Sequence, residues 1–268
     1  MDRSRMNIAI VGAGRAGGSL AIAAHRSGHT ITSIEGRNPE SVARLVDLIT
    51  IIPGRPDLRI VAVSDDAIPE IAAVIADLAE PVPTVHVSGA VSIAALDPIA
   101  DTDVQVGSIH PLQTLPDAVR GADRLAGAWT AITAEEPLRS DLHDFAASLG
   151  CRPFNLDDDA KPLYHAGAAA AANYTLTTLD LSLALFEAAG VPFEAAHPLM
   201  ETIIANAFDL GPAGALTGPV ARGDIATVAS QVAAIRERVP QAEQLFVDLA
   251  RSTARLAGTL DEIEEALA

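Results

Sequence analysis

The chain has 268 residues, of which 49% are hydrophobic and only 3% aromatic, and its formal net charge at pH 7 is −17. This length predicts two domains or one large domain, and the apolar content predicts a globular protein. The 18 Lys and Arg residues form no basic patch, which argues against nucleic acid or anionic membrane as a partner because both bind clustered positive charge. The sequence has no signal-peptide core and no apolar run of about 18 residues, so the cytoplasm is the expected location.

Residues 1 to 156 alternate between strand and helix patterns. We expect a strand at NIAIVGAG, a helix at RAGGSLAIAAHRSG that ends at Gly28, and a second strand at TITSIEG. Helices are then predicted at PESVARLVDLI and AIPEIAAVIADLA, and strands at LRIVAVSD and PTVHVSG. After VQVGSIHP and AWTAITA, the sheet is completed by a helix at LRSDLHDFAASLG and a strand at CRPFNL, in which Cys151 is expected to be buried. This alternation predicts a doubly wound parallel sheet.

Beyond residue 156 the strand patterns stop. We predict one long helix over residues 158 to 189, which begins at a cluster of three aspartates and ends at Gly190, followed by helices at FEAAHPLMETIIANAFDLG, DIATVASQVAAIRERV and QAEQLFVDLARSTARLAG. Pro162 fits the long helix because it falls in the first turn. The sequence therefore predicts an α/β domain over residues 1 to 156 and an all-helical domain over residues 157 to 268. The mostly apolar helices of this second domain predict a homodimer.

A glycine motif, GAGRAG, stands directly after a predicted strand and opens a predicted helix. In this context we expect Gly12 to make the tight turn, Gly14 to let a pyrophosphate approach the backbone, and Gly17 to allow close packing of the helix on the strand. The first N–H groups of the helix, around Arg15 and Ala16, would face the phosphate charge. The motif therefore predicts a Rossmann domain that binds a dinucleotide. The alternative is a turn of the same shape that binds nothing.

The choice of dinucleotide depends on the end of the second predicted strand. Glu35 lies 18 residues after Gly17, near the place where an acidic residue would hold the ribose 2′-OH of NAD. If the chain turns at Gly36, Arg37 and Asn38 can face the adenosine ribose, and a guanidinium is suited to a 2′-phosphate. NADP is therefore the favoured cofactor, and NAD remains possible.

Seven segments of the sequence together resemble Rossmann-like oxidoreductases that carry the C-terminal domain of unknown function 2520, namely VGAGRAG, GRNPES, VSDDAI, HVSGA, HPLQT, YHAGAAAAANY and ALTGPVARGD. The resemblance covers nearly the whole chain. This family belongs to the wider set with 6-phosphogluconate-dehydrogenase-like helical domains, which includes ketopantoate reductases, pyrroline-5-carboxylate reductases and prephenate dehydrogenases. The resemblance implies an NAD(P)-dependent oxidoreductase with its cofactor in the cleft, a helical domain that forms dimers, and a GRNPE segment that reads NADP.

Polar residues follow two of the predicted strands at their carboxyl ends, where doubly wound sheets bind ligands. We expect Ser64 and Asp65 to flank the cofactor, although Asp65 or Asp66 could instead cap the following helix. Ser88 and Gly89 follow the next strand, where a small residue would let the nicotinamide ring approach, so Ser88 is expected to contact both cofactor and substrate.

His110 precedes Pro111, which steers its backbone toward extended geometry at the end of another strand. The HPLQT segment is similar to one in prephenate and arogenate dehydrogenases, where the matching histidine acts on a substrate hydroxyl, although LQT departs from their sequence. His110 is therefore expected to contact substrate or take part in catalysis. The alternative is a loop histidine whose ring is satisfied by backbone groups.

The long helix carries polar residues around a run of alanines. At about 100° per residue, Lys161 and His165 lie about 40° apart, and Asn173 lies about 80° further round. The spacing of His165 and Asn173 is that of a lysine and an asparagine on the matching helix of ketopantoate reductases. We therefore expect Lys161 or His165 to donate the proton and Asn173 to position the reacting oxygen. The alternative is a helix that packs closely in a dimer core.

Arg222 is the only basic residue of the loop GPAGALTGPVARGD. It could bind a substrate carboxylate or pair with Asp224, which can itself cap the next helix. No Cys and His cluster is present, so no metal is expected. These features predict an NADPH-dependent reductase of a C=O or C=N group in a small carboxylated metabolite. The alternatives are oxidation of the prephenate or arogenate type, and a regulatory protein that binds NADP without turnover.

Overall fold

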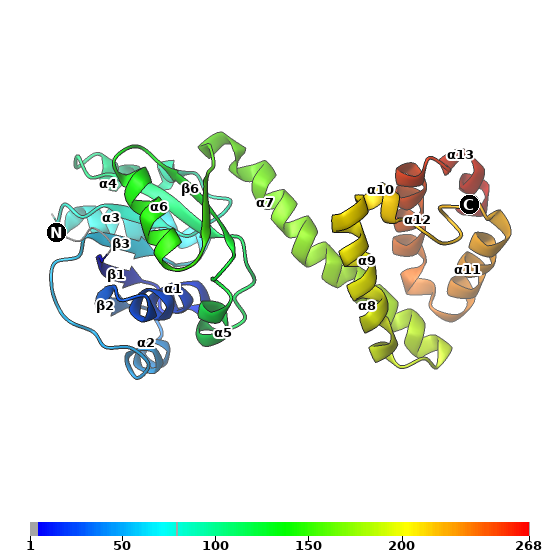
Figure 1. The fold of residues 1–268 in the computed structure, drawn as a ribbon, viewed down its shortest axis with the longest axis horizontal. Coiled ribbons are helices and arrows are strands. Elements are labelled where there is room, and N and C mark those ends of the chain that lie inside the picture. The colour runs from blue at the N-terminus through cyan, green and yellow to red at the C-terminus, as the bar shows by residue number, and fades with distance from the viewer. Residues whose placement is uncertain (1–4, 79, 268) are drawn as a thin grey trace. The chain divides into compact units, whose positions relative to one another are not determined.

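The structure is a computed structural model that describes residues 5 to 78 and 80 to 267. The chain divides into two compact units, one that ends at Ala170 and one that comprises Ala171–Ala268. Figure 1 shows the strands in the first unit and helices in both. The first unit extends beyond residue 156, where the sequence predicts a domain boundary, and so includes the start of the predicted long helix.

The first unit is built on a single mixed sheet. Its strands are β1 (Asn7–Val11), β2 (Thr30–Glu35), β3 (Leu58–Val61), β4 (Thr84–His86), β5 (Val106–Pro111), β6 (Trp129–Ala134) and β7 (Arg152–Asn155), in the spatial order β2-β1-β3-β4-β5-β6-β7. The first five strands run parallel, which confirms the doubly wound arrangement, but β6 is antiparallel to β5 and β7 is parallel to β6. This reversal brings the starts of β6 and β7 to the edge where β5 ends.

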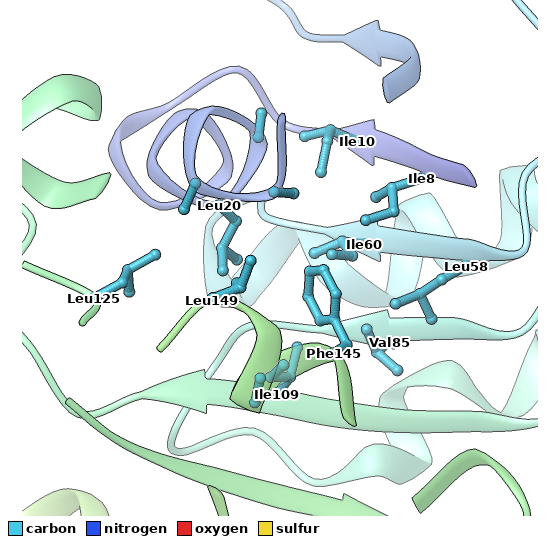
Figure 2. Packing of buried hydrophobic residues seen from close by; sticks show 14 of the residues in the cluster. Ile8, Ile10, Leu20, Leu58, Ile60, Val85, Ile109, Leu125, Phe145 and Leu149 are labelled. Carbon is cyan, nitrogen blue, oxygen red and sulfur yellow. The ribbon is translucent and has the colours of Figure 1, made fainter. Parts of the chain in front are cut away.

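Helices cover both faces of this sheet. They are α1 (Arg15–Arg26), α2 (Pro39–Val46), α3 (Ile68–Asp77), α4 (Asp97–Ala100), α5 (Ala118–Asp123) and α6 (Leu138–Ser148), with short 3-10 turns η1 (Asp65–Ala67), η2 (Ile93–Leu96) and η3 (Asp158–Ala160). One core joins α1 and α6 to the strands, and a second joins α3 and α4 to the opposite face. Figure 2 shows Phe145 of α6 among Leu58, Ile60 and Val85 in the first core. Cys151 is buried, as predicted.

The segment from residue 158 to residue 189 is helical, but it is not one regular α-helix. After η3, α7 (Lys161–Ala169) passes into a π-helical turn, η4 (Ala170–Tyr174), and then into α8 (Thr175–Ala189), which ends at Gly190 with φ +74°. Pro162 stands in the first turn of α7, as expected. Because a π turn contains more residues per turn than an α-helix, the predicted angle between His165 and Asn173 is wrong.

The described residues of the second unit form helices joined by loops, and none of them forms a strand. It contains α8, α9 (Ala196–Leu210), α10 (Pro212–Ala215), α11 (Ile225–Arg238), α12 (Glu243–Ala257) and α13 (Leu260–Ile263), with short 3-10 turns η5 (Phe193–Ala195), η6 (Pro240–Ala242) and η7 (Glu264–Leu267). Val228, Val232 and Ala254 centre one small core of this unit, and Leu181 and Ile235 belong to another. Large apolar side chains remain exposed on α8 and α9, namely Leu176, Leu183, Leu199, Ile204, Phe208 and Leu210. Within residues 5 to 78 and 80 to 267, no helix has both the length and the apolar character that crossing a membrane requires.

Candidate functional site

A cleft of 1130 Å³ lies in the first unit at the carboxyl ends of β1, β2 and β3. Six of the residues predicted to bind a cofactor or read its ribose line this cleft, namely Gly12, Gly14, Glu35, Arg37, Asn38 and Ser64. Arg15, Ala16, Gly17, Asp65 and Ser88 were also predicted to bind the cofactor, but they are not among its lining residues. The cleft therefore brings together the glycine motif and the end of β2, as the sequence predicts.

The three glycines of the motif differ in what surrounds them. Gly12 has φ +114°, and a Cβ atom there would lie 2.3 Å from the carbonyl oxygen of Ala62. A Cβ atom at Gly17 would lie 1.9 Å from the carbonyl oxygen of Gly12, whereas a Cβ atom at Gly14 would meet no atom within 4 Å. The protein backbone itself thus requires glycine at the first and last positions. At Gly14 no protein atom would clash with a side chain. The missing side chain instead leaves space in the open cleft, so this position fits a group that approaches from the cleft.

The start of α1 is electrostatically suited to an anion. Gly14 is its N-cap residue and makes no side-chain capping hydrogen bond, and the first turn contains no acidic residue. The first N–H groups of α1 are therefore not paired with a carboxylate of that turn, and the positive end of the helix dipole is not offset there. The residues present fit the pyrophosphate of a dinucleotide.

The end of β2 holds the two residues that could read the ribose. The backbone N–H of Gly12 donates to the carbonyl oxygen of Glu35 at 2.8 Å, which ties the glycine turn to β2. The side chains of Glu35 and Arg37 are exposed beside this turn. Asn38 is the N-cap of α2, and its Oδ1 accepts from the N–H groups of Glu40 and Ser41 at 2.9 and 3.3 Å. Its side-chain oxygen is thus already engaged in holding α2.

The residues after β3 form the short 3-10 turn η1, and none of their side chains caps α3. Ser64 is the N-cap of η1, and α3 begins after it with Ala67 as an N-cap that makes no side-chain bond. The alternative in which Asp65 or Asp66 caps α3 is therefore wrong. A hydrogen bond from Ser64 lowers the pKa of Asp66 below its usual value, and the charge of Arg37 acts in the same direction.

A second group of polar residues lies on one face of β4 and β5, at their carboxyl ends. His86 pairs with Ser108 in the sheet register, and His110 stands two residues further along β5 on the same face. The Nζ of Lys161 donates to the Oγ of Ser108 at 2.6 Å, and the hydroxyl of Tyr164 lies 2.7 Å from Nδ1 of His110. Lys161 and Tyr164 are three residues apart on α7, so one face of this helix supplies both contacts.

Small residues shape the surroundings of His110. On the sheet, Ala131 lies between His110 and Phe154 in the strand register. The Tyr164 ring centroid lies 5.5 Å from that of His110 and 6.1 Å from that of Phe154. On another side, a Cβ atom at Gly89 would lie 2.7 Å from Cε1 of His110, so the imidazole packs against the glycine backbone.

Asp158 fixes the start of α7 to the segment that follows β4. Its carboxylate accepts from the Oγ of Ser92 at 2.5 Å and from the N–H of Ile93 at 2.9 Å, and it lies 3.9 Å from the Nζ of Lys161. Ser88 shapes the same segment, because its Oγ accepts from the N–H groups at positions 90 and 91. The oxygen of the Ser88 hydroxyl therefore already accepts two hydrogen bonds from the backbone.

Burial sets the charge states in this cluster. It lowers the pKa of His86 and of His110 to about 4. Lys161 lowers the pKa of both rings further, and His165 also lowers that of His110. Burial also lowers the pKa of Lys161 to about 8, although the carboxylates of Asp158 and Asp65 favour its charged form. At pH 7 the two imidazoles are therefore neutral, and the buried ammonium of Lys161 is close to its titration range.

The structure separates the residues predicted to be catalytic. Lys161 is only 1% exposed, whereas His165, one helical turn later, is exposed. His110 contacts Tyr164 rather than backbone groups, so the alternative of a loop histidine satisfied by the backbone is wrong. Asn173 lies in η4, at the beginning of the second unit.

Arg222 lies in the second unit, exposed in the segment before α11. Asp224 caps α11, as predicted, through a bond of 3.1 Å from the N–H of Thr227. That bond and one from the Thr227 hydroxyl lower the pKa of Asp224, and the charge of Arg222 adds to the effect. No ion pair between Arg222 and Asp224 is found among the described residues. In that same part of the chain, no group of three or more His, Cys, Asp and Glu could hold a metal ion.

Sequence reasoning missed Tyr164, Ser108, His86 and Asp158 as members of the polar cluster. A signal for two of them was present. In GSIHP, Ser108 and His110 alternate onto one face of a strand, and in KPLY, Lys161 and Tyr164 are three residues apart on a helix. Only the contact between that strand and that helix was not readable from the sequence.

Comparisons with known proteins agree with the two halves of this architecture. A Rossmann-like domain model matches residues 1–111, and the model of the domain of unknown function 2520 (DUF2520) matches residues 128–253. No curated protein matches the sequence. A crystal structure described as an NADP oxidoreductase from Bacteroides fragilis is 22% identical with a TM-score of 0.79, and the match covers 95% of this chain and 100% of that one.

Two further solved structures have the same fold. A reductive aminase from Aspergillus terreus, in complex with NADPH and ethyl levulinate, is 16% identical with a TM-score of 0.66, and the match covers 96% of this chain and 99% of that one. A 1-pyrroline-5-carboxylate reductase from Streptococcus pyogenes is 18% identical with a TM-score of 0.60, over 98% and 99% of the two chains. The chain thus combines a Rossmann-like domain with a DUF2520 domain, as its seven motif segments predict.

Proposed function

We propose that this protein is an NADP-preferring oxidoreductase that reduces a C=O or C=N group of a small carboxylated metabolite, in the manner of ketopantoate reductases. The observation that carries the proposal is the cleft in which Gly14 faces open space between the start of α1 and the exposed Arg37. The three solved structures of the same fold are named as an NADP oxidoreductase, a reductive aminase with NADPH and a reductase of a pyrroline carboxylate. NAD remains an alternative cofactor through Glu35.

The roles of the chain's own residues follow from their chemistry. A bound nicotinamide would supply the hydride, and the protein would orient the substrate and supply a proton. We assign proton donation to Lys161 or His165, positioning of the reacting oxygen to Asn173, and the substrate carboxylate to Arg222. Ser88 and His110 would line the nicotinamide side.

The experiment that tests the function is a screen of keto acids and cyclic imines for oxidation of NADPH by the full chain. Turnover of any of them supports the proposal. Tight binding of NADPH without turnover of any substrate would favour a regulatory NADP-binding protein. Reduction of NADP⁺ by a hydroxylated substrate, with no reaction in the reverse direction, would favour the alternative of prephenate-type oxidation, which the position of His110 at the end of β5 suggests.

Replacing Lys161 with methionine tests the proton donor. If Lys161 is the donor, kcat should fall by roughly 10²- to 10⁴-fold while the affinity for NADPH stays within about twofold of wild type, because a donor acts chiefly in the transition state. His165→Ala is the matched variant on the next turn of α7, and the two should not lose activity equally. Wild-type kcat in both variants would exclude both residues as donors.

The cofactor preference depends on Arg37. We expect Arg37→Ala to lower the ratio of NADPH to NADH affinity by roughly 10- to 100-fold, because a charge-assisted contact with the 2′-phosphate would be lost. Fluorescence titration with both cofactors measures the ratio. Arg44→Ala, an exposed arginine of α2, is the control and should change nothing. An unchanged ratio in Arg37→Ala would make Glu35 the residue that reads the ribose.

A homodimer built through residues 157 to 268 stays a proposal. It is supported by the exposed apolar side chains of α8 and α9, of which Phe208 is 88% exposed. Light scattering that finds a monomer at micromolar concentration would contradict it.

A further inference from the structure

We propose that Tyr164 fixes the tautomer of His110, so that the neutral ring presents its Nε2–H group as a hydrogen-bond donor to the carbonyl oxygen of the substrate. The part that concerns the substrate rests on the proposed function and narrows it to a carbonyl group. The part that concerns the tautomer rests on the structure of the first unit alone.

The direction of the hydrogen bond between Tyr164 and His110 decides the tautomer. The hydroxyl oxygen of Tyr164 lies 2.7 Å from Nδ1 of His110. A phenolic hydroxyl is a good donor, and the unprotonated nitrogen of a neutral imidazole is a good acceptor. In the described part of the chain, the Tyr164 hydroxyl has no other hydrogen-bond partner. If Nδ1–H of His110 donated instead, the phenolic proton would have no acceptor in the protein. A bond from the Tyr164 hydroxyl to Nδ1 pairs both the phenolic proton and Nδ1, so we assign this direction.

The orientation of the His110 imidazole is set by two neighbouring residues. A Cβ atom at Gly89 would lie 2.7 Å from Cε1 and 2.9 Å from both ring nitrogens, so one side of the imidazole rests on that glycine. The Tyr164 ring meets the imidazole edge to face, with 88° between the ring planes. The ring is thus held from two sides. Because Nδ1 accepts from Tyr164, the proton of the neutral ring must be on Nε2.

The Nε2 atom of His110 is free to bind a ligand. Among the described residues no hydrogen-bond partner of Nε2 is found, and His110 is half-buried rather than enclosed. It stands near the carboxyl end of β5, the edge at which sheets of this kind bind ligands. The Nε2–H group is therefore an unpaired donor in a position where a ligand can reach it.

The imidazole ring of His110 is neutral at physiological pH. Three titratable groups besides Tyr164 act on His110, namely Lys161 and His165 on α7 and Asp65 in η1. Burial is the main reason that the pKa of His110 is about 4, and His165 and Lys161 act in the same direction. Burial also raises the pKa of Tyr164 to about 12. Both partners stay neutral across the physiological range, so the tautomer does not change with pH there.

The tautomer decides which chemistry His110 can assist. A carbonyl oxygen that gains negative charge during reduction is stabilised by a hydrogen-bond donor. The same donor stabilises the oxyanion when the reaction runs in the direction of oxidation, because both directions share one transition state. A protonated imine, by contrast, has no lone pair to accept a bond. Tyr164 is thus a positioning residue that suits His110 to a carbonyl substrate.

Nitrogen-15 NMR of the histidine rings in the full chain tests the tautomer without substrate or cofactor. In the wild type at pH 7, the ring signals that disappear in His110→Gln should be those of a single Nε2–H tautomer. In Tyr164→Phe, the Nδ1–H form should become populated. Tyr174→Phe, which changes the only other tyrosine, should match the wild type. An Nδ1–H tautomer in the wild type, or an unchanged tautomer in Tyr164→Phe, would overturn the proposal.

A second arm tests the role toward substrate. With a carbonyl substrate, His110→Leu should lower kcat on the order of 100-fold, whereas His110→Gln, whose amide N–H can stand in for Nε2–H, should retain more activity. Equal losses in the two variants would overturn donation to the substrate. If the wild type turns over no substrate while its NMR signals show the Nε2–H form, the proposed function fails and the tautomer assignment stands.

Discussion

Replacing Gly14 with alanine should leave the protein folded and weaken NADPH binding by roughly 10- to 100-fold, because the new methyl group would occupy the space that the pyrophosphate needs. Gly14 has an ordinary φ of −80°, and a Cβ atom there would meet nothing within 4 Å. Its loss as an N-cap residue should cost no more than about 1 kcal/mol of unfolding free energy. NADPH fluorescence and urea unfolding measure the two effects separately.

Gly17→Ala is the opposite case in the same motif. Its Cβ atom would lie 1.9 Å from the carbonyl oxygen of Gly12, so the backbone of the turn or of α1 must move. We expect roughly 3 kcal/mol of destabilisation, at the upper end of the usual cost of overpacking. Gly167→Ala in α7, where a Cβ atom also meets nothing within 4 Å, is the control and should stabilise the helix by about 0.5–1 kcal/mol. Equal destabilisation by Gly14→Ala and Gly17→Ala would contradict this account.

The alternation of strands and helices was predictable because each element buries its apolar residues with its own period. This periodicity does not reveal the direction of a strand, as the strands after β4 show. A strand alternates with period two in either direction, so the sequence AWTAITA contains no information that β6 runs antiparallel to β5. The π turn at η4 was equally hidden, since alanine is the strongest α-helix former and a run of alanines predicts a regular α-helix.

The candidate site was predictable where one local segment forms it and was missed where two segments meet. The glycine motif contains its own turn, so the roles of Gly12 and Gly17 could be assigned from spacing alone. Lys161 and His165 were expected on one face of a helix, but Lys161 is buried because Ser108 and Asp158 receive its ammonium group. Asp158 stands three residues before Lys161, a spacing that a helix brings together, but Ser108 comes from β5, and helical periodicity cannot supply it.

Lowering the pH from 7 to 5 should destabilise the first unit through histidines that the fold keeps neutral. His29 is 3% exposed, its Nδ1 accepts from the N–H of Met6 at 3.0 Å, and its other nitrogen lies 2.7 Å from the Oγ of Ser148. Burial lowers the pKa of His29 below its usual value and that of His86 and His110 to about 4. Protonation would turn the Nδ1 of His29 from an acceptor into a donor that faces another donor.

The number of protons bound by the folded and the unfolded chain determines whether the unfolding free energy rises or falls with pH. In the unfolded chain each of these three rings has a pKa of about 6.5. Between that value and their lower folded pKa values, the unfolded chain binds more protons than the folded one, so the unfolding free energy falls as the pH falls. The stabilisation is fully present above about pH 6.5. His86 and His110, whose folded pKa is about 4, each contribute a slope of up to about 1.4 kcal/mol per pH unit, so together they should remove several kcal/mol. The lowered pKa of His29 acts in the same direction.

Carboxylate repulsion acts in the opposite direction, because the net charge of −17 declines as the pH approaches the isoelectric point of about 4.6. We expect the histidines to dominate, since exposed charges are screened by salt whereas the buried rings are not. Urea unfolding at pH 7, 6 and 5 can be followed by the fluorescence of Trp129, the single tryptophan, which reports on the first unit. His29→Asn should reduce the pH dependence even if it lowers stability at every pH. His197→Gln, which removes a ring that is 77% exposed, should leave the slope unchanged. A wild-type unfolding free energy that is equal at pH 7 and pH 5, with the same slope in His29→Asn, would show that these rings are not held neutral by the fold.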